Sequence, residues 1–210
     1  KFNGLYYPQE YLCTVKEEHS RPLHIFLLLN DSVIKNITNC HSFVGYSPLI
    51  FALPSIKETN LHNQNIIKIA YSNVPLNIGS TVSKKDIVAT LQLKKIKEQK
   101  IDQSSFYYFE GLKGEHKFLS SFHQFIIHLN NELYNKKRGN VFLKNNLFKQ
   151  VQIAYALPRV ISLITIRSND LYNLFPTDLH GQINDEYYII SLRYEGNACK
   201  QAEATKKIVL

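Results

Sequence analysis

The apolar residues of this chain come in short segments, and turn-forming residues separate them. Leu23–Leu29 is followed by Asn30–Ser32, and Leu49–Leu53 lies between Gly45–Pro48 and Pro54. Apolar segments of this length, bounded by turn residues, are typical of β-strands joined in hairpins. None approaches the ~18 residues that a membrane-spanning helix needs. The sequence therefore predicts a β-rich protein that does not cross a membrane.

Further strands are expected along the chain. By their β-branched and aromatic content they are Tyr11–Lys16, Ile66–Ala70, Val160–Ile166, Leu171–Phe175 and Tyr187–Leu192, and Ile208–Leu210 begins another. Ser80–Ile101 fits a strand or a helix, because Leu91 and Leu93 alternate as in a strand while Ile87 and Leu91 are four residues apart. We favour a strand.

One long helix is predicted at Phe118–Lys137. Its apolar residues recur at intervals of three and four and are Phe122, Phe125, Ile126, Leu129 and Leu133. Ser120 or Ser121 can cap its start, and Gly139 follows its end. We expect its apolar face to turn toward the core. Shorter helices are expected at Leu147–Ala154 and Ala198–Thr205.

Composition indicates one compact unit in a reducing compartment. A chain of 210 residues, 44% hydrophobic, can bury one core. Cys13, Cys40 and Cys199 are odd in number and form no CxxC pair, so we expect free thiols. The N-terminal residues do not have the pattern of a secretory signal, and a cytoplasmic location is expected. The chain has no methionine, which predicts a fragment or a sequence without its modified methionines.

The net charge of +8 raises nucleic acid as a partner, but its distribution argues against it. Lysine outnumbers arginine by 20 to five and is spread along the chain, whereas arginine binds phosphate and base edges better. Lys94–Lys100 is the one cluster that keeps this class open. Gly111–Gly114 has the spacing of a loop that clamps nucleic acid, but a hairpin or loop turn accounts for it better. The eight histidines show no metal-ligand spacing, and no metal is expected.

Three segments near the C-terminus carry the most specific pattern. They are Leu157–Thr165, Asn173–Asp178 and Ile190–Arg193, followed by Lys200. The first is a Pro-Arg strand that ends in a threonine, the second contains Asn-x-x-Pro-Thr, and the third leads into a short helix. This arrangement, from Ala156 to Leu210, resembles the opening half of flavin-reductase-like FMN-binding domains.

The resemblance implies a β-dominated α+β fold, a split β-barrel of the FMN-binding type with one long helix. It implies FMN as cofactor, a hydride from NAD(P)H as its reductant, and a homodimer, because such barrels place the flavin at a subunit interface. The implied cofactor-binding residues are Asn173, Thr177, Asp178, Ser191, Arg193 and Lys200. Hydroxyl groups and cations can bind the phosphate dianion of FMN by charge-assisted hydrogen bonds. No catalytic acid or base is evident, and His180 is the nearest polar candidate.

The pattern departs from that family in its position. It lies at the C-terminal end of the chain, and Val160 stands where the family has a second proline after Pro-Arg. We expect residues 1–110 to be a β-rich half, for which a degenerate half-barrel is one reading, residues 111–150 a helical connector, and residues 151–210 the flavin-reductase-like segment of one unit. Two other functional classes stay open: a split-barrel interaction module without cofactor, and a nucleic-acid-binding protein.

Overall fold

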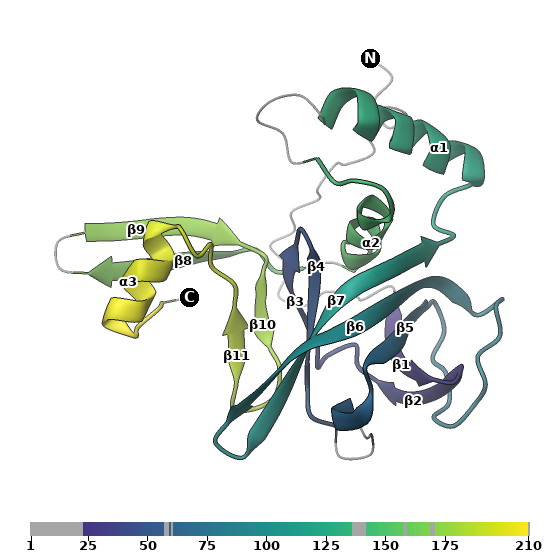
Figure 1. The fold of residues 1–210 in the computed structure, drawn as a ribbon, viewed down its shortest axis with the longest axis horizontal. Coiled ribbons are helices and arrows are strands. Elements are labelled where there is room, and N and C mark those ends of the chain that lie inside the picture. The colour runs from purple at the N-terminus through teal and green to yellow at the C-terminus, as the bar shows by residue number, and fades with distance from the viewer. Residues whose placement is uncertain are drawn as a thin grey trace.

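A large antiparallel sheet dominates the computed structural model, which describes residues 23–56, 59, 61–135, 142–157, 159–168 and 171–209 (Figure 1). Its seven strands run in the order β2-β1-β5-β6-β7-β4-β3. Their bounds are β1 His24–Leu29, β2 Ser32–Asn36, β3 Ser42–Tyr46, β4 Leu49–Pro54, β5 Ile66–Ser72, β6 Ile87–Ile101 and β7 Ser104–His116. All neighbouring pairs are antiparallel. The β-dominated fold is thus confirmed, while closure into a split barrel stays a prediction.

The remaining elements follow or interrupt this sheet. Two small antiparallel hairpins pair β8 with β9 and β10 with β11. The bounds are β8 Ser162–Ser168, β9 Leu171–Thr177, β10 His180–Gln182 and β11 Tyr188–Ile190, with helices α1 Ser121–Asn130, α2 Asn146–Ala154 and α3 Asn197–Thr205. A 3₁₀ turn covers Leu61–Asn63 and a π turn Asn131–Asn135. Among the described residues, no helix is long and apolar enough to cross a membrane.

Most of the expected elements are present with shifted ends. The hairpin turn between β1 and β2 is confirmed, with Asn30 and Asp31 at φ values of 49° and 60°, as a two-residue hairpin loop requires. Ser80–Ile101 contains the strand β6, so the strand reading is confirmed for its last 15 residues. The strand predicted at Tyr11–Lys16 lies outside the described residues. Three strands have no counterpart in the sequence prediction: β3, the long strand β7 and the short strand β10.

The core lies on the face of the sheet that α2 covers. Phe51, Ile69, Leu91 and Phe109 come from four strands and are fully buried there, and Ile153 of α2 belongs to the same cluster. These side chains alternate with residues on the opposite face, as the period of a strand requires. On the opposite face, a smaller cluster of Ala52, Phe106 and Ile183 fixes the β10–β11 hairpin against β4 and β7.

The two glycines of the Gly111–Gly114 motif lie inside β7, so the turn predicted there is wrong. A Cβ atom at Gly114 would meet the Cα of Gln150 at 3.1 Å and Ile153 Cδ1 at 3.0 Å, both in α2. At Gly111 it would lie 2.0 Å from the Gln150 Oε1 atom. The side chain of Asn146 completes this contact: its Oδ1 accepts from the Gly114 N–H (2.6 Å) and its Nδ2 donates to the Gly114 carbonyl (2.8 Å). The glycines are therefore needed for the close approach of α2 to the sheet.

Replacing Gly114 with alanine should destabilise the protein by about 1–3 kcal/mol, the usual range for overpacking, because the backbone of α2 must shift to admit a methyl group. Urea unfolding followed by circular dichroism measures the loss. Gly181→Ala is the matched control, because the nearest atom to its Cβ is Ser42 Oγ at an ordinary 3.5 Å. Equal losses in both variants would contradict the close packing at Gly114.

The predicted long helix is α1 with the π turn after it, but its orientation is opposite to the expectation. Ser120 Oγ caps it by accepting from the His123 N–H (3.4 Å), as predicted. Four of the five expected core residues are exposed, at fractions of 68% for Phe122, 61% for Phe125, 42% for Leu129 and 60% for Leu133, while Ile126 is half-buried.

Polar side chains instead tie this helix to the rest of the chain. The Gln124 Nε2 donates to the carbonyls of His116 (3.2 Å) and Leu119 (2.9 Å), and the buried Asn131 donates to the Leu143 carbonyl (2.9 Å). These bonds satisfy carbonyl groups at the end of β7, just before α1 and before α2. The apolar stripe therefore points away from the core.

Candidate functional site

A cavity of about 440 Å³ lies where three distant parts of the chain meet. Its wall is drawn from residues 38–43 before and within β3, from residues 154–162 between α2 and β8, and from residues 178–188 around β10. The volume falls within the range of cofactor and substrate sites in proteins. It is the one cavity that we take as the candidate site.

Arg159 forms one wall of this cavity and is largely buried, with 14% of its side chain exposed. Its guanidinium lies over three aromatic rings, 4.5 Å from Phe43, 5.5 Å from Tyr46 and 5.4 Å from Tyr155. Its Nη2 also donates to the Ala154 carbonyl at 3.3 Å. Planar guanidinium groups stack on aromatic faces in this way, and each such contact stabilises the cation.

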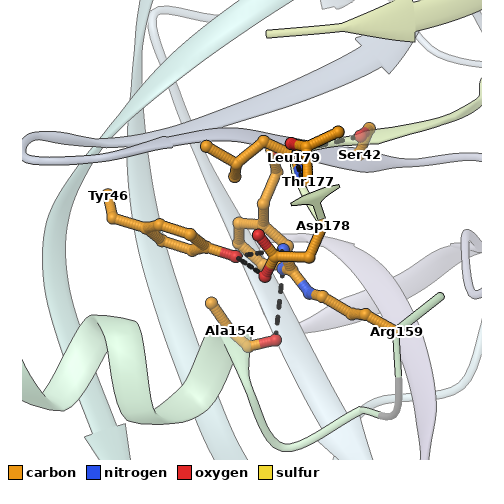
Figure 2. A network of polar contacts seen from close by, with 8 residues as sticks. Ser42, Tyr46, Ala154, Arg159, Thr177, Asp178 and Leu179 are labelled. Carbon is orange, nitrogen blue, oxygen red and sulfur yellow. Dashed lines mark hydrogen bonds and ion pairs between the residues drawn. The ribbon is translucent and has the colours of Figure 1, made fainter. Parts of the chain in front are cut away.

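Tyr46 joins Arg159 to Asp178 (Figure 2). The Arg159 Nη1 donates to the Tyr46 hydroxyl, which in turn donates to Asp178 Oδ2 at 3.0 Å. The guanidinium and the carboxylate are themselves 4.0 Å apart, and Asp178 is 24% exposed. Burial raises the pKa of Tyr46 well above its usual range, against the opposing effect of Arg159. Tyr46 therefore stays protonated and acts as a hydrogen-bond donor to the carboxylate.

The lining of the cavity also contains His180 and Tyr188, which β10 and β11 place side by side. Their rings stack with centroids 5.7 Å apart, and His180 Nδ1 shares a hydrogen bond with the Tyr188 hydroxyl. Burial is the main cause that lowers the pKa of His180; Arg159 acts in the same direction and Asp178 against it. The imidazole is therefore neutral at pH 7. Its Nε2 is buried without a hydrogen-bond partner among the described residues.

The six predicted cofactor residues fall into three groups. Asp178 lines the cavity. Next to it, the Thr177 hydroxyl accepts a hydrogen bond from the Leu179 N–H (3.1 Å), and the Leu179 carbonyl accepts one from the Ser191 N–H (2.9 Å). Thus Thr177, Asp178 and Ser191 are brought together. Arg193 and Lys200 are exposed on either side of Gly196, whose N–H donates to the Arg193 carbonyl (2.9 Å). Asn173 lies further up β9, opposite Ile166. Apart from Asp178, none of the six lines the cavity.

Sequence reasoning missed the central cation and its aromatic surroundings. Arg159 was part of the Pro-Arg pattern but was assigned no binding role, although it is one of only five arginines in the chain. The pattern itself was the signal that could have identified it. Tyr46 and Tyr155, whose rings stack 5.0 Å apart, carried no signal, because neither belongs to a motif.

Two lysines of the Lys94–Lys100 cluster make contacts within the protein. The Lys95 Nζ donates to the Leu61 carbonyl (3.2 Å) and lies 5.5 Å from the Tyr107 ring, and Lys97 lies 6.0 Å from the Tyr108 ring. These contacts occupy two of the basic groups that nucleic acid would need. No group of three or more potential metal ligands is found among the residues that the structure describes. Of the three cysteines, Cys40 and Cys199 are free thiols, and Cys13 lies outside the described part of the chain.

Tyr46 and Tyr71 allow a matched test of these hydrogen bonds. Tyr46→Phe should cost about 1.5–3 kcal/mol, the usual worth of a hydrogen bond to a charged group. Tyr71→Phe should leave the free energy of unfolding unchanged or raise it, because the Tyr71 hydroxyl is fully buried with no partner among the described residues. Denaturant unfolding of both variants measures the difference. A loss of more than ~1 kcal/mol in Tyr71→Phe would show that its hydroxyl is hydrogen-bonded after all.

Comparison with known proteins gives matches in structure alone. No family model matches the sequence, and no curated protein matches it at a significant level. The flavin reductase PheA2 matches 46% of this chain and 78% of its own, with 11% identity and a TM-score of 0.34. Flavoredoxin from Methanosarcina acetivorans matches 93% of this chain and 100% of its own, with 9% identity and a TM-score of 0.34. An FMN-binding protein from Thermus thermophilus matches 52% and 79%, with 6% identity and a TM-score of 0.33.

These matches bear the names of the family that the C-terminal motifs resemble. At TM-scores of 0.33 to 0.34 they carry no argument about cofactor or activity, and any functional proposal must rest on the residues of the cavity. The chain is similar to flavin-reductase-like FMN-binding proteins.

Proposed function

We propose that this protein binds a flavin mononucleotide at the cavity beside Arg159 and Asp178, and that it is an oxidoreductase of the flavin-reductase type. The observation that supports the proposal is the meeting of three motif segments at one cavity. Arg159, Ser162 and Asp178 line it, and Thr177 and Ser191 lie directly beside it. A cavity of about 440 Å³ has the size of a cofactor site, and this one combines polar side chains such as Ser42 and Ser162 with the apolar Val160.

The donor chemistry of the cavity fits a flavin ring better than a charged ligand. The positive charge of Arg159 is already balanced by Asp178 and surrounded by aromatic rings, and His180 is neutral at pH 7. What remains for a ligand is a set of uncharged polar groups, including Ser42 and Ser162, beside the apolar Val160. Such a wall suits a ring system with an apolar face and a polar edge.

The phosphate of the cofactor would lie outside the cavity, toward the exposed cations. Thr177 and Ser191 would supply hydroxyl groups, and Arg193 and Lys200 positive charge, for a dianion that must stay in contact with water. Asn173 is the sixth residue that we assign to cofactor binding. When bound, the flavin supplies hydride chemistry, with NAD(P)H as the donor, while the chain binds and orients it and excludes water.

Ligand titration of the purified protein tests this proposal. Isothermal calorimetry should show binding of FMN. Arg193→Ala should weaken that binding about 10- to 150-fold, which corresponds to the ~1.5–3 kcal/mol of a hydrogen bond to a charged group, and should change riboflavin binding little. Arg167→Ala is the control. It also removes an arginine, but this one lies over the Tyr172 ring on β9 and is not among the residues that we assign to the phosphate.

Three results would contradict the proposal in different ways. If the wild type binds neither FMN, FAD nor riboflavin at high micromolar concentration, the cofactor assignment is wrong. If Arg193→Ala weakens FMN and riboflavin equally, the phosphate has been assigned to the wrong residues. Loss of FMN binding in Arg159→Met, together with unchanged FMN binding in Arg193→Ala, would indicate that the phosphate binds inside the cavity.

A second candidate function is an interaction module that binds no flavin. The exposed stripe of Phe122, Phe125, Leu129 and Leu133 on α1 favours it, because large apolar side chains in a row on one helix face are typical of a binding surface. A colourless protein that takes up no added flavin, and that binds another protein through α1, would support this candidate.

A further inference from the structure

The apolar stripe of Phe122, Phe125, Leu129 and Leu133 lies along one face of α1 and the π turn that follows it. Its members follow one another at intervals of three and four residues, so they share a helix face. Figure 1 shows α1 at the edge of the molecule, beyond α2 and the large sheet. Large apolar side chains gathered on one exposed face mark an interaction surface.

Hydrogen bonds on the other side of the helix fix the outward direction of the stripe. Gln124 donates to the carbonyls of His116 (3.2 Å) and Leu119 (2.9 Å), and the buried Asn131 donates to the Leu143 carbonyl (2.9 Å). Turning the stripe toward the core would break these bonds and leave part-buried polar groups without their partners. The stripe is therefore a built feature of the surface.

Exposed lysines lie at both ends of the stripe. Lys117 precedes the helix, and its Nζ donates to the Lys84 carbonyl (2.7 Å), which places Lys84 and its exposed neighbour Lys85 at the same end. Lys144 lies at the other end, because it follows Leu143, whose carbonyl is hydrogen-bonded to the end of the helix. Positive charge thus borders an apolar face at both of its ends.

The charge of this region is also high for the chain as a whole. Residues 117–149 contain six lysines and arginines and one acidic residue, Glu132, so that +5 of the net charge of +8 falls in this segment. Asp86 follows Lys85 and lowers the charge at the first end only in part. A basic surface of this kind attracts a negatively charged partner.

We propose that the apolar stripe inserts into the surface of a membrane that contains anionic lipids, with α1 lying in the plane of the interface. An interfacial helix buries its phenylalanines and leucines at the boundary between headgroups and acyl chains, and the lysines beside it bind the negative headgroups. Such a contact is peripheral and requires no membrane-spanning segment.

The chemistry of the stripe favours lipid over a protein groove. Trp, Tyr and Arg dominate the binding energy of protein interfaces, and leucine is under-represented among the residues that do so. The stripe consists of two phenylalanines and two leucines, none of which has a hydrogen-bonding side chain. Acyl chains offer no hydrogen-bond partners, so a face without polar side chains loses no hydrogen bond on entering them.

Co-sedimentation with phospholipid vesicles tests this inference, and it is done without flavin because the inference is independent of the proposed function. The wild type should bind vesicles of phosphatidylcholine with about one third phosphatidylserine at ~0.1 M salt. Binding to pure phosphatidylcholine should be at least ~10-fold weaker, because the lysines then have no anionic partner. At ~1 M salt the binding should weaken as well, because the charges are screened.

Phe125→Ser should lower the binding to the anionic vesicles about 10-fold, which is roughly the effect of leaving one large apolar side chain in water. Leu174→Ser is the matched control and should leave binding unchanged. Leu174 is as exposed as Phe125, at 64% against 61%, but it belongs to β9, in the arm that β8, β9 and α3 form (Figure 1). Phe122→Ser should act like Phe125→Ser and keeps the test valid if Phe125→Ser fails to fold, as judged by circular dichroism.

The role of the lysines is tested with a second matched pair. Lys144→Glu should weaken the binding to the anionic vesicles several-fold, because it reverses a charge beside the stripe. Lys207→Glu, which reverses an exposed charge just beyond α3, should change the binding little, because the screening length at this salt is about 10 Å.

Two outcomes would overturn the inference. A wild type that does not bind the anionic vesicles at ~1 mM lipid would exclude a membrane and leave a protein as the partner of the stripe. Equal losses in folded Phe125→Ser and Leu174→Ser would show that the vesicles do not contact α1. Flavin binding by a protein that binds no vesicles would contradict this inference and leave the proposed function in place.

Discussion

Replacing Arg159 with methionine is expected to lower the free energy of unfolding by about 2–4 kcal/mol, below the 3–5 kcal/mol of a fully buried ion pair because Asp178 is 24% exposed. The variant leaves Asp178 without its cation and removes the contacts with three aromatic rings and the Ala154 carbonyl. Methionine preserves most of the volume of the side chain, so that a cavity contributes little. Denaturant unfolding at pH 7 measures the loss.

Arg167→Met is the control for this experiment. Arg167 also lies over an aromatic ring, Tyr172, but it is exposed on the arm, and its loss should cost less than ~1 kcal/mol. A double-mutant cycle with Asp178→Asn isolates the coupling between the two charges. Equal losses for Arg159→Met and Arg167→Met would mean that the network of Figure 2 does not stabilise the fold.

Replacing Asn146 with alanine is expected to cost about 2–4 kcal/mol, because both backbone groups of Gly114 lose their partner in a part-buried place. One side-chain amide here fixes α2 to β7, and α2 covers the core. The loss should therefore also reach the cavity, since residues 154–162 follow directly on α2. Urea unfolding gives the free energy, and hydrogen exchange at the Gly114 amide should rise in the variant.

Asn184→Ala is the matched control, because the same substitution also removes two hydrogen bonds. The Asn184 Oδ1 accepts from the N–H groups of Glu186 (3.1 Å) and Tyr187 (2.8 Å) in the turn between β10 and β11. Water can replace the more exposed of these bonds, so the loss should stay near ~1 kcal/mol. A loss at Asn146 no larger than at Asn184 would show that the link between α2 and β7 is dispensable.

Most strands other than β3, β7 and β10 could be predicted from the sequence because they depend on local signals. The hairpin β1–β2 follows from an apolar segment and two turn residues that tolerate positive φ, and the hairpin β8–β9 from two apolar segments around a polar turn. The helices α2 and α3 followed from spacing and lie within one residue of their predicted starts. The strand β10 was missed because its three residues, His180–Gln182, carry no apolar alternation.

Of the candidate site, the sequence predicted one wall and missed the rest. Asp178 lines the cavity directly after the Asn-x-x-Pro-Thr pattern, with Thr177 beside it. Its hydrogen-bond partner Tyr46 lies 132 residues away, in a strand with no motif. Arg159 and Asp178 also come from different segments, which pack together only when β8 pairs with β9 and β10 reaches β3.

The sequence by itself determined which residues of α1 share a face, because helical periodicity is a property of neighbouring residues. Only the tertiary structure decided which way that face turns: hydrogen bonds from Gln124 and Asn131 to carbonyls outside α1 fix the helix with its apolar stripe outward. The same holds for Gly111 and Gly114: these positions must lack a side chain only because α2 packs against them. Local patterns record the conformational preferences of a segment, whereas its neighbours in space depend on contacts between residues far apart in the chain.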